Sequence, residues 1–188
     1  MNTLKTIAIC VLIISAFACK KETTETNDPN IDDRVVNIFL DSISGTANKT
    51  IDIDDDGSND FMIFISHPGA ILSNSQIGIN GMGNAEFVSS IVGSAGDLIT
   101  PLTSGTTINS ANTTWKSLAA FYFFDAGVSS TKFGFSDVGD KLVAFRLVNG
   151  ANYKYGWMKV NVVNGQEITI KEFGMQTAEN TAIAAGAK

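Results

Sequence analysis

The stretch "FRLVNGANYKYGWMKVNVVNGQEITIKEF", residues 145–173, decides the fold class of this chain. Polar and apolar residues alternate along it, so that Ile168 and Ile170 fall on one face, which is the period of a half-buried β-strand. Asn149 and Asn164 are each followed by glycine. An Asn-Gly pair between two alternating runs is a strong hairpin signal, because both residues accept a positive φ. The stretch therefore predicts a three-stranded antiparallel meander.

The remainder of residues 34–188 has the same character. Short apolar runs are broken by Gly, Asn, Asp and Ser, and no run keeps a helical period across three turns. Residues 117–121 contain no helix breaker and leave room for one short helix. We expect an all-β domain, built as a single antiparallel β-sandwich of the jelly-roll or lectin-like kind.

Composition limits the classes of function. The chain has 188 residues, of which 44% are hydrophobic and 17% are charged, and this suffices for one domain with a sizeable core. The formal net charge is -6, and no basic stripe interleaves with aromatic residues. Because an acidic chain repels phosphate groups, we expect no nucleic-acid partner.

The N-terminal segment "MNTLKTIAICVLIISAFAC", residues 1–19, has the parts of a bacterial secretory signal. Lys5 supplies the basic start, residues 6–17 are apolar but too short for a stable membrane span, and small residues precede Cys19. We expect residues 1–18 to be removed as a signal peptide. One interpretation is an ordinary secretory signal in which Cys19 is incidental.

The end of this segment also resembles the lipobox of bacterial lipoproteins, although that family usually carries Leu where this chain has Ala16. The resemblance implies that Cys19 becomes the first residue of the mature chain and carries lipid, such as palmitate. It further implies anchoring to the outer membrane, facing either the periplasm or the cell surface. Cys10 lies in the part that is removed, so no disulfide is expected.

The segment "KKETTETNDPNIDD", residues 20–33, contains one aliphatic residue and many charges. It cannot bury a core, so we expect the lipidated Cys19 and this segment to form a disordered tether over residues 19–33. Lysines followed by acidic residues after the cysteine resemble the surface-export signal of Bacteroidetes lipoproteins. A plain periplasmic tether is the alternative.

The segment "IDIDDDGSNDF", residues 51–61, concentrates five aspartates. Counting from the first, oxygen donors occupy positions 1, 3, 5, 7 and 9, and Gly57 occupies position 6. This is the spacing of EF-hand-like calcium loops, in which alternate side chains converge on a hard cation and the glycine permits a sharp turn. The candidate calcium ligands are Asp52, Asp54, Asp56, Ser58 and Asp60.

The loop departs from an EF-hand at position 12, where the bidentate Glu of that motif is replaced by Ile63. The flanking runs are predicted strands rather than helices. A bidentate ligand would then come from Asp55 or from a distant Asp. The alternative is a metal-free turn, because Asp, Gly, Ser and Asn are also turn formers.

Tyr153, Tyr155 and Trp157 alternate on one face of the predicted central strand of the meander. Two interpretations are open, namely an aromatic platform that binds a sugar or a peptide, and packing within the protein. The "YGW" strand, the "IAAG" ending and the "DGSNDF" loop together resemble secreted β-sandwich domains of environmental bacteria. That resemblance implies a fold and a location rather than an activity.

No catalytic motif stands out. His67 is the single histidine, is expected in a turn before Pro68 and Gly69, and has no Cys or His partner for zinc; no G-x-S-x-G occurs. We therefore expect a non-enzymatic cell-envelope lipoprotein whose calcium-stabilised domain is a binding or structural module. Its expected partners are the membrane, through the lipid, and a glycan or an envelope protein. The alternative is a carbohydrate-active protein, either a lectin-like binder or a small glycosidase.

Overall fold

The C-terminal meander is present in the computed structural model, which describes residues 30–32, 36–39, 45–67, 75–91, 96–112, 114–125 and 131–188. Its strands are antiparallel neighbours: β12 (Lys141–Asn149), β13 (Asn152–Val163) and β14 (Glu167–Met175). Asn164 and Gly165 have φ angles of 52° and 63°, and the N–H of Gln166 donates to the carbonyl of Val163 at 3.0 Å. These positive φ angles are what the Asn-Gly pair predicts for a hairpin turn.

The meander is part of a 13-stranded sheet with the order β1-β14-β13-β12-β6-β7-β10-β5-β4-β3, to which β2, β9 and β11 attach at β14, β6 and β10. Neighbouring strands are antiparallel except for the parallel pair of β7 and β10. The other strands are β1 (Asn30–Asp32), β2 (Val36–Phe39), β3 (Gly45–Ile51), β4 (Phe61–His67), β5 (Ser75–Gly81), β6 (Ala85–Ile91), β7 (Asp97–Ile99), β9 (Trp115–Lys116), β10 (Leu118–Asp125) and β11 (Thr131–Gly134).

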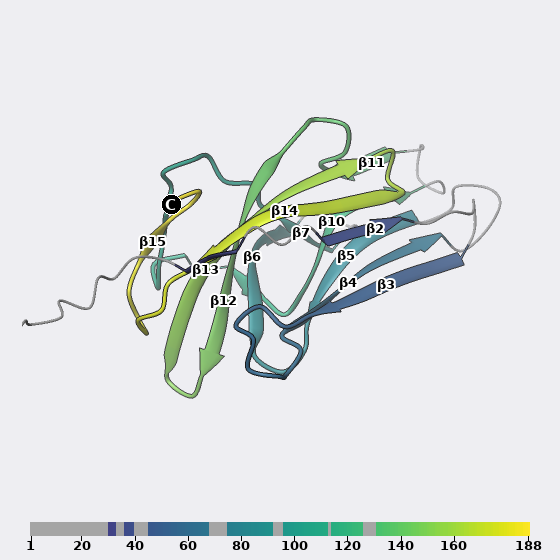
Figure 1. Cartoon of the computed structure of the whole chain (residues 1–188). Helices are drawn as coiled ribbons and strands as arrows, with labels where there is room; N and C mark the ends of the chain where they lie inside the picture. Colours follow the sequence, from purple (N-terminus) through teal and green to yellow (C-terminus); the bar gives the residue numbers. More distant parts are fainter. Residues whose placement is uncertain are drawn as a thin grey trace, which may run out of the picture.

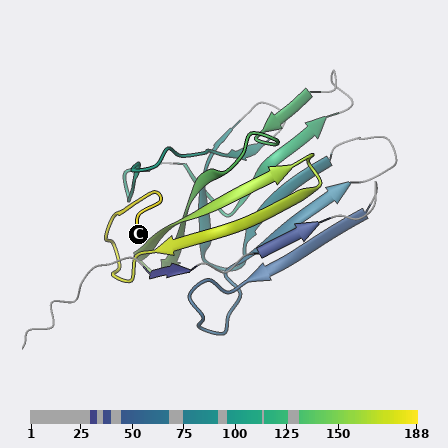
Figure 2. The same ribbon diagram turned by 45° about the horizontal axis from the view of Figure 1, so that its top comes forward.

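This sheet curls into a half-barrel (Figure 1). β6 is shared by its two halves, because residues 85–88 pair with β12 and β9 and residues 89–91 pair with β7. At the far ends of the sheet, β2 lies beside β3 and β4, so the two ends approach each other (Figure 2). Register shifts interrupt the β10–β5 ladder at Phe121 and the β13–β14 ladder at Lys171, and such bulges increase local bending.

The expected all-β, mostly antiparallel architecture is present, as one large sheet whose halves curl toward each other and a small second sheet (Figure 1). The physical reason is that a twisted sheet of this width buries its apolar face most simply by curling around it. The strand alternation was predicted, but the sharing of β6 between both halves depends on pairings between distant segments.

The main core lies inside the curl. β4 illustrates how it is built, because Phe61, Ile63 and Ile65 are buried while the alternating residues are partly exposed. Phe61 packs edge-on against Phe87 of β6, with ring centroids 5.7 Å apart. Burying such side chains provides most of the driving force for folding.

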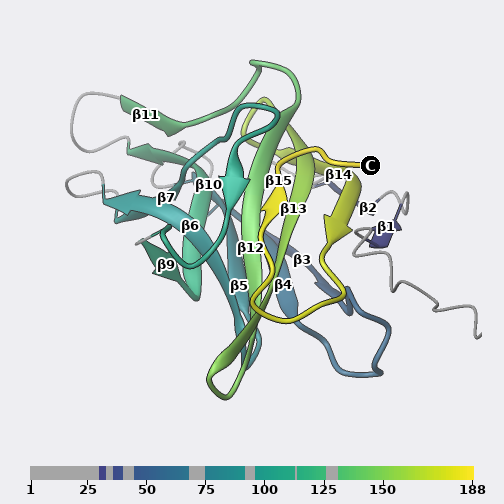
Figure 3. The ribbon, with the colours of Figure 1, turned by 90° about the vertical axis from the view of Figure 1, so that its left-hand side faces the viewer.

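A second, small sheet covers the outer face of the meander (Figure 3). It pairs β8 (Thr107–Ile108) with β15 (Ile183–Ala184). Between this small sheet and the large one lies a separate apolar cluster, which consists of Val88, Ile108, Ala144, Tyr155, Trp157, Ile183 and Ala185. β13 is consequently buried on both faces.

The short helix considered for residues 117–121 is wrong, and the described residues contain no helix. This segment belongs to β10, which pairs with β5. Ala119 and Phe121 are buried, and the carbonyl of Ser117 accepts a hydrogen bond from the N–H of Gly81 at 2.6 Å. Pairing and burial override the absence of helix breakers.

At the N-terminus, Asn30–Asp32 pairs with β14 as β1, so these three residues of the expected tether belong to the sheet. The predicted signal peptide, residues 1–18, and Cys19 lie outside the described residues. In the part of the chain that the structure describes, no helix has the length and apolar character needed to cross a membrane.

Candidate metal centre

The Asp-rich segment forms the loop between β3 and β4. These strands pair up to Ile51 opposite Phe61, and the N–H of Asp60 donates to the carbonyl of Ile51 at 2.9 Å, which closes the base of the loop. Ile51, Ile53 and Phe61 are buried and fix the loop to the core. The apolar residues on either side of the aspartates thus determine where the carboxylates lie.

The loop wraps around the side chain of Asp52. One carboxylate oxygen of Asp52 accepts the N–H of Asp56 at 3.2 Å, and the other accepts the N–H of Gly57 at 2.8 Å. Gly57 has a φ of 91°, which glycine adopts at little cost, and Asp55 has a φ of 57°. The carboxylate of Asp56 accepts the N–H of Ser58 at 2.7 Å. Asp and Gly at these positions therefore have a role in the turn itself.

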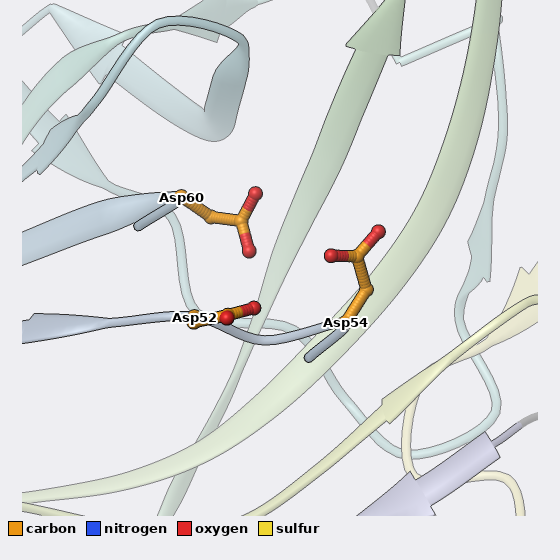
Figure 4. A group of neighbouring side chains, drawn as sticks. All are labelled: Asp52, Asp54 and Asp60. Carbon is orange, nitrogen blue, oxygen red and sulfur yellow. The ribbon is translucent and has the colours of Figure 1, made fainter. Parts of the chain in front are cut away.

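Three of the five proposed ligands come together (Figure 4). Asp52, Asp54 and Asp60 each offer a carboxylate oxygen, and these oxygens lie within 4.8 Å of one another. Oxygens on one calcium ion, each at about 2.3–2.6 Å from it, lie no more than about 5 Å apart. Asp56 lies outside this three-Asp group, and its carboxylate binds the N–H of Ser58. These three carboxylates could thus hold a metal ion between them.

Asp60 is the buried member of the three-Asp group, with 5% of its surface exposed. The pKa of its carboxyl is raised to about 6, mainly because burial disfavours the charged form. The hydrogen bond from the N–H of Ile53 lowers this pKa, and the negative charges of the nearby Asp carboxylates raise it. That hydrogen bond is 2.8 Å long. A carboxylate in such a place is costly without a positive neighbour, because charge is poorly solvated there.

A pocket of about 260 Å³ opens beside the group. Its walls include Asp54, Asp56 and Asp60 from the loop, and Asn84, Asn149 and Lys154 from elsewhere. The ammonium of Lys154 lies 3.5 Å from Asp54 Oδ2. Asn84 and Asn149 bring amide oxygens, which are also ligands for hard cations. Sequence reasoning missed these residues because strand pairing, not a motif, brings them to the loop.

The aromatic residues of β13 lie on one face as predicted, but that face is covered. Tyr155 is 1% exposed and Trp157 is fully buried, and both belong to the apolar cluster under the small sheet. Tyr153 is partly buried, and the guanidinium of Arg146 lies 4.2 Å from its ring centroid and 4.6 Å from that of Trp115. Arg146 also pairs with Glu86. This arrangement favours packing over a sugar-binding platform.

His67 is not the turn residue that the sequence suggested. It is the last residue of β4 and is 2% exposed. Its Nε2 lies 3.0 Å from the carbonyl oxygen of Gly165, and its Nδ1 lies 2.6 Å from the hydroxyl of Ser75. Because a carbonyl only accepts, Nε2 carries the proton and Nδ1 accepts from Ser75. His67 therefore connects two strands of one half to the β13–β14 turn, and no described carboxylate hydrogen-bonds to it.

Comparison of this chain with protein-family models, with curated proteins and with solved structures found no match in any of the three.

Proposed function

We propose that this protein is a cell-envelope lipoprotein whose curled β-domain is a calcium-stabilised binding or structural module. The observation that supports it is the convergence of Asp52, Asp54 and Asp60 on one point at the edge of the core. Calcium bridges the β3–β4 loop in this proposal and offsets the charge of the buried Asp60. The two halves of the sheet then correspond to the layers of a jelly-roll or lectin-like sandwich.

The chemistry of the three-Asp group favours calcium over other ions. The group contains carboxylates and neither Cys nor His, and oxygen-only ligation is typical of hard cations. Magnesium demands near-ideal octahedral geometry, whereas calcium tolerates an irregular set of ligands and a flexible loop. Sites of extracellular modules bind calcium at about 0.1–1 mM, which suits a domain outside the cytoplasm.

The location rests on the N-terminal sequence. The proposal places lipid on Cys19 and a tether after it, so that the domain is held at the outer membrane. Cys19→Ser should then move the protein from the membrane fraction to the soluble fraction. Unchanged fractionation would remove the lipid anchor from the proposal and leave the calcium site intact.

Thermal melts of the full chain, with calcium and with chelator, test the metal site. A hundredfold excess of calcium over Kd should stabilise the fold by about 2.7 kcal/mol and raise the melting temperature by ~5–10 °C. Asp54→Ala should abolish this rise because it removes a ligand. Asp140→Asn is the matched control, since Asp140 is an exposed partner of Lys171 outside the three-Asp group. Identical melting in both buffers, with no calcium uptake by calorimetry, would refute the site.

A further inference from the structure

A second pocket lies on the other half of the sheet and shares no residue with the metal centre. It has a volume of about 280 Å³, and Phe64, Gln76, Asp97 and Leu118 are among its lining residues. Phe64 alternates with the buried Ile63 and Ile65, so it lies on the outer face of the sheet. The pocket is therefore a groove on the outside of β4, β5, β7 and β10, strands that Figure 3 shows in one half of the curl.

The small residues Gly96, Ala119 and Ala120 are among those that line this groove, and Phe64 lies beside them. Gly78 of β5 pairs with Phe64 on β4 and with Ala120 on β10. The ring of Phe64 lies across Gly78, because a Cβ added there would be 2.4 Å from the ring atom Cζ. One side of the ring thus rests on the strand, and the other is turned away from the sheet. The pair presents a flat aromatic surface beside a shallow floor.

The rim of the groove carries polar groups with unused hydrogen-bonding capacity. The carboxylate of Asp97 is partly exposed; its Oδ1 is buried, and its Oδ2 lies 3.7 Å from the ammonium of Lys116, too far for a hydrogen bond, and so offers an acceptor to the groove. Gln76 adds an amide with two donors and one acceptor. Leu118, which is 55% exposed, adds an apolar edge. A ligand that offers both C–H groups and hydroxyl donors matches this rim.

We propose that this groove binds one sugar residue of a neutral glycan. The apolar face of the pyranose ring lies against Phe64 and Leu118, and hydroxyl groups donate to Asp97 and exchange hydrogen bonds with Gln76. An anionic ligand is disfavoured by Asp97 and by the net charge of -6. A cationic ligand would compete with Lys116, which already offsets the charge of Asp97. The volume, just below the usual range of about 300–1,000 Å³ for ligand pockets, suits a single ring.

The full chain, purified in mild detergent and labelled with ¹⁵N, is the material for the test. A glycan array identifies neutral glycans that bind, and the methyl glycosides of their terminal sugars are then titrated while amide shifts are recorded. We expect saturable shifts at Gln76, Asp97 and Ala120. Phe64→Leu, which keeps an apolar side chain and removes the ring, should weaken binding about tenfold, and Asp97→Ala should weaken it at least as much.

Phe133→Leu is the matched control, because Phe133 of β11 is a partly buried aromatic that pairs with Phe123 and does not line the groove. It should leave sugar binding unchanged. The proposal is overturned if no glycan binds, or if bound sugars shift amides elsewhere. It is also overturned if Phe64→Leu and Asp97→Ala both leave the affinity unchanged. Calcium binding to the three-Asp group is measured separately, so either proposal can fail alone.

Discussion

The ammonium of Lys154 lies 3.5 Å from Asp54 Oδ2, and the two residues are 100 positions apart in the chain. Lys154 belongs to β13, whereas Asp54 belongs to the β3–β4 loop. In the metal-free protein, Lys154 is thus a positive charge placed beside the three carboxylates where a cation would bind. The ammonium of Lys154 partly compensates the negative charge of the three-Asp group, and it competes with a metal ion for the carboxylate of Asp54.

Replacing Lys154 with Gln should therefore raise the affinity for calcium about fivefold, because a positive charge a few ångströms from the ion opposes binding by about 1 kcal/mol at a partly exposed site. Calorimetric titration of calcium into both proteins measures this. Lys171→Gln serves as the control, since Lys171 pairs with Asp140 away from the metal centre. Equal or weaker calcium binding by Lys154→Gln would show that the ion does not lie near Asp54.

Because the pKa of Asp60 is raised, the free energy of unfolding measured in chelator should fall as the pH rises. In the folded state its pKa is about 6, above the ordinary value of 3.8, so between these two pH values the folded protein holds a proton that the unfolded chain has lost. The associated stability is complete below pH 4 and is lost as the pH rises through 6, with a magnitude of the order of 3 kcal/mol. Urea melts from pH 4 to pH 7 should show this fall.

Asp60→Asn should reduce the loss of stability between pH 4 and pH 7, because an amide of the same shape does not titrate. A slope that persists in Asp60→Asn would assign the effect to another group. Saturating calcium should also oppose the fall in the wild-type protein, since the ion favours the ionised carboxylate.

The lowered pKa of Glu172 predicts that, at lower pH, stability rises as the pH rises. This buried residue of β14 accepts a hydrogen bond from the ammonium of Lys159 at 2.7 Å, and the ammonium of Lys188 forms an ion pair with its other oxygen at 2.7 Å. These contacts, that with Lys159 first, lower the pKa of Glu172 below its ordinary value of 4.5. The stability it contributes is complete above pH 4.5 and is lost as the pH falls through the folded-state pKa.

Glu172→Gln should therefore lower the stability at pH 7 and remove part of the loss seen below pH 4.5. Urea unfolding at pH 7 and at pH 3 compares the two proteins. A constant difference between wild type and Glu172→Gln at both pH values would mean that the carboxylate contributes through packing rather than through charge.

Local signals predicted the strands well. The alternation around Ile168 and the Asn164-Gly165 pair depend on neighbours in sequence, and the corresponding strand and turn form. The first hairpin also forms, but its turn residues are Gly150 and Ala151, because Asn149 pairs with Asn152 at the end of β12. The spacing of the Asp loop likewise identified the aspartates, three of which converge. Such features can be read from sequence because the physics that determines them acts within about ten residues.

Long-range features could not be read in this way. The curl depends on β6 pairing with β12 through residues 85–87 and with β7 through residues 89–91, and no local pattern specifies both partners. His67 illustrates the consequence, because Pro68 and Gly69 indicate a turn, yet its ring is buried against Gly165 of a distant hairpin. Lys154 reached the metal centre by the same kind of pairing. Register between distant strands is determined by packing of the whole core.

Two glycines of the meander give a matched pair of variants. Gly150 and Gly165 occupy its two turns with φ angles of 61° and 63°. A Cβ at Gly150 meets nothing within 4 Å, whereas a Cβ at Gly165 would lie 2.4 Å from the Cε1 atom of Tyr122, a side chain that is 6% exposed. Both substitutions to Ala strain the backbone, but Gly165→Ala also forces a buried ring to move.

We expect Gly150→Ala to destabilise the fold by about 1–2 kcal/mol, the cost of a left-handed conformation for a residue with a Cβ. Gly165→Ala should cost about 1–3 kcal/mol more, because overpacking adds to that strain. Urea unfolding in one buffer measures both variants. The double variant Gly165→Ala, Tyr122→Leu separates the two contributions, since the smaller side chain should reduce the excess cost. Equal destabilisation by the two single variants would mean that Tyr122 does not pack against the turn that His67 holds in place.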